Sequence, residues 1–167
     1  FGDGTPATLP PTQGRHGLLG LLTTLGREPE DGALGATSLG AAFVRAGAIA
    51  RQRGIVVVVS DFRGPLDWRT PLLQLLDRHD VLAVEIRDPR EQELPDVGEL
   101  WLVDPETGRQ VRVDTRSTAL RQRFAAAAAE ERSGVARMFT ALGVPHLVLS
   151  TAGEWLRPFA VFLGTRR

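Results

Sequence analysis

The chain has no cysteine, no lysine and no tyrosine, so several kinds of chemistry are excluded. Without cysteine it forms no disulfide and offers no thiolate as a nucleophile or metal ligand. Without lysine it has no Schiff-base residue, no lysine general base and none of the lysines that a phosphate-binding P-loop needs. Every one of its 20 basic residues is an arginine, a bias that a GC-rich genome explains.

The chain also lacks a net charge and a long apolar segment. Its 20 basic residues balance 20 acidic residues, which argues against a nucleic-acid surface or a polybasic membrane patch. No apolar run is long enough to span a membrane, and no signal peptide is recognisable. The 167 residues suffice for one domain with its own core, so we predict a single domain over residues 1–167.

The most informative stretch of the chain begins at Ile55. Five β-branched residues in a row are followed directly by Ser60, Asp61 and Phe62. A short unbroken apolar run of this kind predicts a strand that is buried on both faces. Ligands of open α/β sheets bind beyond the carboxyl ends of the strands. Asp61 would therefore lie at a position suited to binding a metal ion or a phosphate. A second interpretation is that Asp61 caps the following turn.

The order of the remaining elements predicts the fold class. Strands are expected at 55–60, 81–86 and 146–149, and helices at 16–25, at 37–53, in the dozen residues before 79, at 116–142 and at 155–163. Alternating strands and helices imply right-handed crossovers, hence an α/β fold in three α/β/α layers with a mostly parallel sheet of Rossmann type. Turn residues between 99–103 and 110–113 add a small β-hairpin insertion.

Two oxygen-bearing side chains are candidate metal ligands. Thr37 precedes a helix, and Asp61 ends a strand, so both would reach the same rim of a doubly wound sheet. Oxygen ligands of this kind suit Mg²⁺. The alternative is that Thr37 is only a helix cap and Asp61 only a turn residue.

Other polar residues have a functional and a structural interpretation. His79 is expected at a helix end, where a positive charge is favourable, and His146 precedes the last strand without a recognisable partner. The charged segment 88–93 is either a docking site or a solvated loop.

Several motifs resemble the second half of a von Willebrand factor A-type domain. They are TSLGAA at 37–42, GIVVVVSDF at 54–62, HDVLAV at 79–84 and DPREQELP at 88–95. More narrowly, the chain resembles the bacterial family of proteins of unknown function numbered fifty-eight, and the resemblance covers nearly its whole length. The most specific pieces are the Ser60-Asp61-Phe62 strand end and the stretch that begins at Asp88.

The resemblance implies a metal-ion-dependent adhesion site. In such domains an Asp-x-Ser-x-Ser motif, a later threonine and a strand-end aspartate hold the metal, and Thr37 and Asp61 match the last two. The first motif has no counterpart, so the domain is expected to be truncated at its N-terminus, with Mg²⁺ binding weak or absent. Without a central strand, the sheet would have edges with unpaired backbone N–H and C=O groups. A homodimer could form by pairing these edges.

By this resemblance we expect a non-enzymatic adaptor that binds proteins and works with a MoxR-type AAA+ ATPase in complex assembly or activation. It would be cytoplasmic, either free or as the soluble domain of a membrane-anchored parent chain. An alternative is an aspartyl phosphoryl-transfer enzyme of receiver or haloacid-dehalogenase type that uses Asp61, although receiver domains rely on a lysine that is missing here. A third hypothesis is a purely structural domain in which the metal-binding rim around Thr37 and Asp61 is vestigial.

Overall fold

The computed structural model describes residues 9–10, 12–26, 38–64, 66–103 and 108–165. The chain divides into two compact units, 1–38 with 103–111 and 39–102 with 112–167. The first unit contains helix α1 (Gly14–Leu25), which has no buried residue. The expectation of a single domain over the whole chain stays a prediction, and the candidate ligand Thr37 lies outside the described residues.

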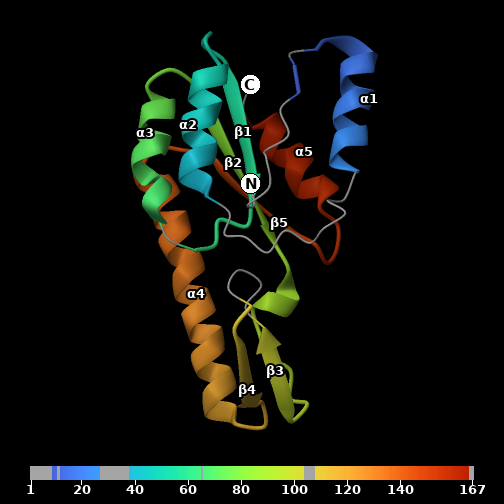
Figure 1. Ribbon diagram of the computed structural model, residues 1–167, viewed down its shortest axis with the longest axis vertical. Helices are drawn as coiled ribbons and strands as arrows, with labels where there is room; N and C mark the ends of the chain where they lie inside the picture. The colour runs from blue at the N-terminus through green and yellow to red at the C-terminus, as the bar shows by residue number, and fades with distance from the viewer. Residues whose placement is uncertain (1–8, 11, 27–37, 65, 104–107, 166–167) are drawn as a thin grey trace. The chain divides into compact units, whose positions relative to one another are not determined.

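The second unit is built on a parallel sheet (Figure 1). Its strands are β1 (Ile55–Ser60), β2 (Asp80–Arg87) and β5 (His146–Ser150), in the spatial order β1-β2-β5. Val57 lies beside Leu82 in the parallel register of β1 and β2. Parallel neighbours need long crossover connections, and helices provide them here. The prediction of a mixed α/β fold with a parallel sheet is confirmed.

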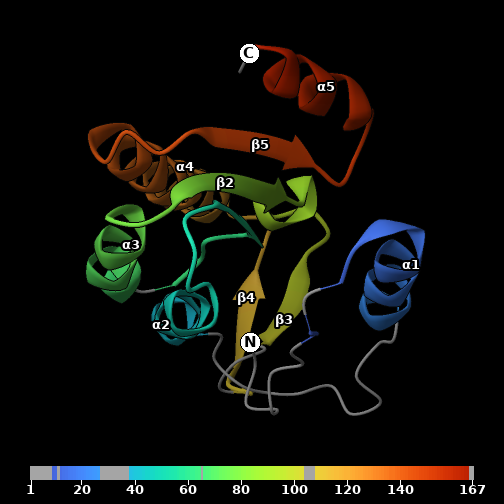
Figure 2. The same ribbon diagram turned by 90° about the horizontal axis from the view of Figure 1, so that it is seen from above.

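One face of the sheet is covered by helices α2 (Leu39–Ile49), α3 (Arg69–Leu76) and α4 (Thr118–Ala141), as Figure 2 shows from above. The core on this face contains Leu39, Phe43, Phe62, Trp68, Leu72, Leu75, Val81, Ala83, Val135, Phe139 and Val144. Its centre is aromatic, with ring centroids of Phe62 and Phe139 only 5.0 Å apart and edge to face.

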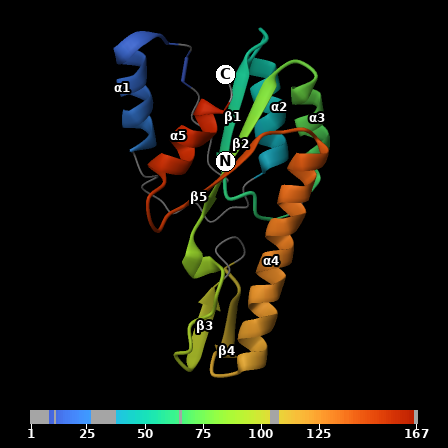
Figure 3. The ribbon, with the colours of Figure 1, turned by 180° about the vertical axis from the view of Figure 1, so that it is seen from behind.

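The opposite face is covered by helix α5 (Leu156–Gly164) over β2 and β5 (Figure 3). Alternate residues of β2 and β5 point to this side because side chains of a strand alternate between faces. They form a smaller core of Leu82, Val84, Leu147 and Leu149, with Phe159 and Phe162 of α5 packed against it.

The prediction that β1 is buried on both faces is wrong. Val56 and Val58 pack against the core beneath α2 and α3, but Ile55, Val57 and Val59 are 73%, 54% and 62% exposed. The α5 side chains pack against residues of β2 and β5, and β1 is an edge strand of the described sheet. The run of valines therefore has one buried and one open side.

Beyond the sheet, helix ends and turns largely follow the expected pattern. Ser117 caps α4 by accepting a hydrogen bond from the Leu120 N–H at 3.3 Å. Helix α2 ends earlier than expected, and a 3₁₀ turn η1 (Leu66–Trp68) leads into α3.

No helix in the described part of the chain is both long and apolar enough to cross a membrane.

Strands β3 (Glu99–Val103) and β4 (Gln110–Asp114) pair as a two-stranded sheet, which confirms the hairpin prediction. Thr115 fixes the end of this sheet. Its fully buried hydroxyl donates to the Gly98 carbonyl at 2.7 Å and accepts from the Val97 N–H at 3.2 Å.

The two sides of β1 are expected to respond differently to the same substitution. Val58→Thr places a hydroxyl against the core and should lower the free energy of unfolding by about 1–2 kcal/mol. Val57→Thr, the matched control, keeps the β-branched shape on the open side and should change it by less than about 0.5 kcal/mol. Urea unfolding of both variants measures the difference. Equal losses at the two positions would contradict the assignment of faces.

Candidate functional site

Asp61 lies directly after β1, at the carboxyl end of the parallel sheet, and is exposed. Its Oδ1 accepts hydrogen bonds from the Arg63 N–H at 3.3 Å and from the Ser60 hydroxyl at 3.4 Å. The carboxylate thus stabilises the turn, as the capping interpretation predicted. Its other oxygen accepts no hydrogen bond from the described residues, and because the residue is exposed this oxygen is free for a ligand.

The turn after Asp61 depends on an unusual backbone conformation at Phe62. Phe62 has φ of 53°, the only non-glycine positive φ among the described residues, and its side chain is 1% exposed. A non-glycine residue in the left-handed region costs about 1–2 kcal/mol. The aromatic packing of Phe62 offsets this strain, and its N–H donates to the Ser60 hydroxyl at 3.0 Å. Strained backbone of this kind concentrates at functional sites.

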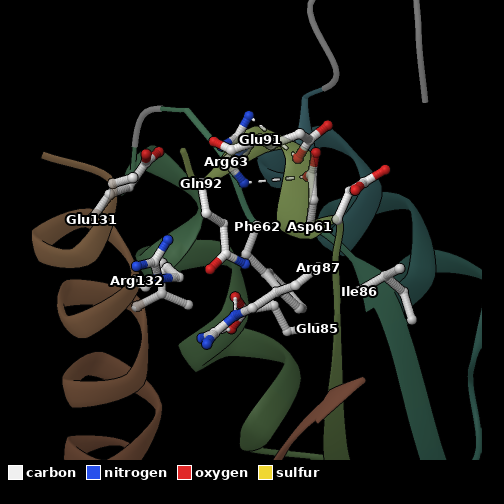
Figure 4. A pocket seen from close by; sticks show the side chains of 13 residues that line it. Asp61, Phe62, Arg63, Glu85, Ile86, Arg87, Glu91, Gln92, Glu131 and Arg132 are labelled. Carbon is white, nitrogen blue, oxygen red and sulfur yellow. Dashed lines mark hydrogen bonds and ion pairs between the residues drawn. The ribbon is translucent and has the colours of Figure 1, made fainter. Parts of the chain in front are cut away.

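A small polar pocket opens beside Asp61 (Figure 4). It is lined by Asp61, Phe62, Arg63, Glu85, Ile86, Arg87, Asp88, Glu91, Gln92, Ala128, Glu131, Arg132 and Val135. These residues come from the carboxyl ends of β1 and β2, from the turn that follows β2 and from α4. The free interior measures about 30 Å³, far below the several hundred Å³ of a cofactor site.

Glu85 is a buried carboxylate at the base of this pocket, with only 3% of its side chain exposed. Its Oε2 lies 2.8 Å from His146 Nε2 and accepts a bond from Arg87 Nη2 at 3.0 Å. Arg87 Nε also donates to Oε1, so the guanidinium binds the carboxylate in a bidentate manner through Nε and Nη2.

The partner of His146, which the sequence analysis did not find, is therefore Glu85. In the parallel register His146 lies beside Ala83, two residues before Glu85 and on the same face of β2. The ring of His146 also contacts Phe139, at a centroid distance of 4.8 Å. The sequence contains one signal of this pair. It is a glutamate at a core-facing position of a buried strand, followed two residues later by an arginine.

The surroundings of Glu85 shift its pKa. Burial by itself raises the pKa, but hydrogen bonds from His146 and Arg87, together with the positive charge of Arg87, outweigh it. The pKa of Glu85 is therefore held below its usual value of 4.5.

A second ion pair joins the Asp61 turn to the 3₁₀ turn η2 (Pro89–Glu91). Arg63 Nη1 lies 3.4 Å from a Glu91 carboxylate oxygen, and Arg63 Nη2 donates to the Glu91 carbonyl at 3.3 Å. Asp88 caps η2 by accepting from the Arg90 N–H at 2.9 Å. The charged stretch that begins at Asp88 is thus brought next to Asp61. Arg90, Glu91 and Glu93 are exposed, as in a solvated loop, whereas Asp88 is half-buried.

Asp61 is the one predicted metal ligand that the structure describes. Within residues 9–10, 12–26, 38–64, 66–103 and 108–165, no three His, Cys, Asp or Glu side chains are grouped to hold a metal ion. A single exposed carboxylate does not match the donor set that Mg²⁺ requires. His79, the other histidine considered, is 5% exposed and directly precedes β2, at the opposite end of the parallel strands from Asp61. Its Nε2 has no hydrogen-bond partner among the described residues.

Glu85→Gln tests the buried network. Because the folded pKa of Glu85 is lowered, the unfolded chain takes up the proton first as the pH falls. The stabilisation is therefore complete above the unfolded value near 4.5 and is lost as the pH falls through the lower folded pKa. We expect Glu85→Gln to lower the free energy of unfolding at neutral pH by about 3 kcal/mol and to flatten its acid dependence.

Urea unfolding at a series of pH values measures both effects. The matched control is Glu99→Gln, which removes an exposed ion pair with Arg112 and should cost at most about 1 kcal/mol. An acid profile of Glu85→Gln that equals that of the wild type would contradict this account.

Comparison with known proteins places the chain in a family. Residues 1–134 match the family described as "Protein of unknown function DUF58". The uncharacterized protein MAV169 of Mycobacterium avium is 39% identical over 161 residues, which cover 95% of this chain and 94% of the relative. The uncharacterized protein Rv1480 of Mycobacterium tuberculosis is 47% identical over 117 residues, which cover 70% of this chain and 37% of the relative.

An equally similar relative is the uncharacterized protein Mb1516 of Mycobacterium bovis, at 47% identity over the same length. The matched part of the chain thus spans about a third of these longer relatives, at 37% of their length. No solved structure matches the chain. From the family match and the mycobacterial relatives, the chain belongs to the DUF58 family of proteins of unknown function.

Proposed function

We propose that the chain is a non-enzymatic, protein-binding adaptor module of the von Willebrand A type. The observation that carries the proposal is the placement of Asp61. It is exposed at the carboxyl end of β1, the turn behind it is held by the buried side chain of Phe62, and a charged pocket lies beside it. A rigid rim with charged side chains suits the recognition of a partner's surface.

The fold supports this assignment in its coarse features. Helices on both faces of a parallel sheet fit a three-layer, Rossmann-type arrangement, and the strand-end aspartate fits an adhesion-site rim. The free edge of β1 would pair with a further strand, such as one of a second copy of the chain, and its exposed side chains Ile55, Val57 and Val59 would be covered by a further element.

In this proposal Mg²⁺ binds at Asp61 only when other ligands complete its coordination. Thr37 would be one of them, and an Asp-x-Ser-x-Ser motif of a longer chain would supply the rest. Such an ion would polarise a carboxylate of the partner. The partner we propose is a MoxR-type AAA+ ATPase in the cytoplasm, with the module helping in the assembly or activation of a complex.

A phosphoryl-transfer enzyme is the competing proposal, and the composition of the chain argues against it. The chain has no lysine to neutralise a phosphorylated aspartate. Incubation with acetyl phosphate should therefore leave the intact mass unchanged. A mass increase of one phosphoryl group that Asp61→Asn abolishes would favour the enzyme.

Asp61→Asn tests the adaptor proposal directly. The variant keeps the size and the turn hydrogen bond of the side chain but removes the charge. We expect its affinity for the MoxR-type ATPase of the same genome, measured by biolayer interferometry in Mg²⁺, to fall at least about tenfold, the loss of one charge-assisted contact.

The matched control is Asp67→Asn, which removes an exposed carboxylate from η1 and should leave binding unchanged. Equal binding by the wild type and Asp61→Asn would contradict a role of the rim. Calorimetry should show Mg²⁺ binding to this chain that is weak or absent.

A further inference from the structure

We propose that the pocket beside Asp61 binds a carboxylate group of the partner protein, and that Arg132 is the residue that holds it. This inference rests on the proposed role as a binding module and names the chemistry of its partner. It needs no metal ion, because the binding group is a guanidinium of the chain itself.

Arg132 is a half-buried arginine whose charge has no partner. It lies on α4 and lines the pocket, and its guanidinium makes no hydrogen bond or ion pair with the residues that the structure describes. The other arginines of the pocket differ, because Arg87 is bound to Glu85 and Arg63 to Glu91. A guanidinium that is partly removed from water without a counter-ion is unfavourable, and a bound anion would offset this cost.

Gln92 supplies a second hydrogen-bonding group on the opposite wall of the pocket. It follows η2, is half-buried, and its side-chain amide has no hydrogen-bond partner in the described part of the chain. Figure 4 shows the side chains of Arg132 and Gln92 extending into the space between α4 and η2. A planar guanidinium binds a planar carboxylate through paired hydrogen bonds, and an amide NH₂ can donate another.

The size of the pocket restricts the ligand. About 30 Å³ of free interior accommodates a few atoms, such as the tip of an aspartate or glutamate side chain. A nucleotide or a metabolite of similar size needs a pocket some ten times larger. The size of the pocket therefore favours a small carboxylate group, and under the proposed function a partner protein presents it.

The acidic residues of the pocket do not cancel this positive site. Arg87 neutralises Glu85 and Arg63 pairs with Glu91, which leaves Asp61, Asp88 and Glu131. Asp88 is engaged at the N-terminus of η2, whereas Asp61 and Glu131 are exposed at the rim, where water screens them. A positive interior within a negative rim fits an acidic side chain that is flanked by basic residues.

Sodium acetate is a probe for this site that needs no identified partner. We expect acetate to shift the Arg132 Nε–H and Gln92 side-chain resonances of ¹⁵N-labelled protein saturably, and sodium chloride of equal ionic strength to leave them in place. Arg132→Gln should weaken acetate binding at least about tenfold, as expected for the loss of a charge-assisted bidentate contact.

The matched control is Arg123→Gln, which removes an exposed arginine from the same helix and should leave acetate binding unchanged. Gln92→Leu should also weaken acetate binding, so the proposal stays testable if Arg132→Gln does not fold. Shifts that chloride reproduces, unchanged acetate binding in a folded Arg132→Gln, or saturation by phosphate but not by acetate would each overturn the proposal. Acetate binding involves no partner protein, so those results would not contradict the adaptor proposal. The adaptor proposal is contradicted only if Asp61→Asn binds the ATPase as well as the wild type does.

Discussion

The packing of Phe62 against Trp68 and Phe139 is the constraint on which the core and the candidate site both depend. Ring centroids lie 5.7 Å apart for Phe62 and Trp68 and 5.0 Å apart for Phe62 and Phe139. The cluster joins the end of β1 to η1 and to α4, and it holds Phe62 in a left-handed conformation. Since Asp61 is the preceding residue, the same packing directs its carboxylate to the outside of the sheet.

The buried charge of Glu85 extends this constraint across the sheet. His146 of β5 both bonds to Glu85 and packs against Phe139, so one side chain connects the polar network to the aromatic cluster. Arg87 completes the neutralisation of Glu85 and keeps the base of the pocket electrically balanced. Arg132 remains the unmatched charge on its wall, which is why a ligand for the pocket would be anionic.

Much of the secondary structure could be predicted from local pattern. The strand at 55–60, the hairpin and the long helix that ends before Gly143 follow from β-branched runs, turn residues and alanine content. The burial of β1 could not be predicted in the same way. A run of valines has the same sequence whether one or both of its faces are covered. In the described part of the chain the cover on the second face comes from α5, which packs on β2 and β5.

The sequence by itself determined the family, the alternation of strands and helices, and the position of Asp61 at a strand end. These features depend on short-range patterns, such as side-chain periodicity and turn chemistry, that residues close in the chain carry. Only the tertiary structure decided that His146 meets Glu85, which is 61 residues away, and that Arg132 stays without a partner beside Asp61. Such contacts depend on the register of parallel strands and on how a distant helix packs, and no local pattern encodes either.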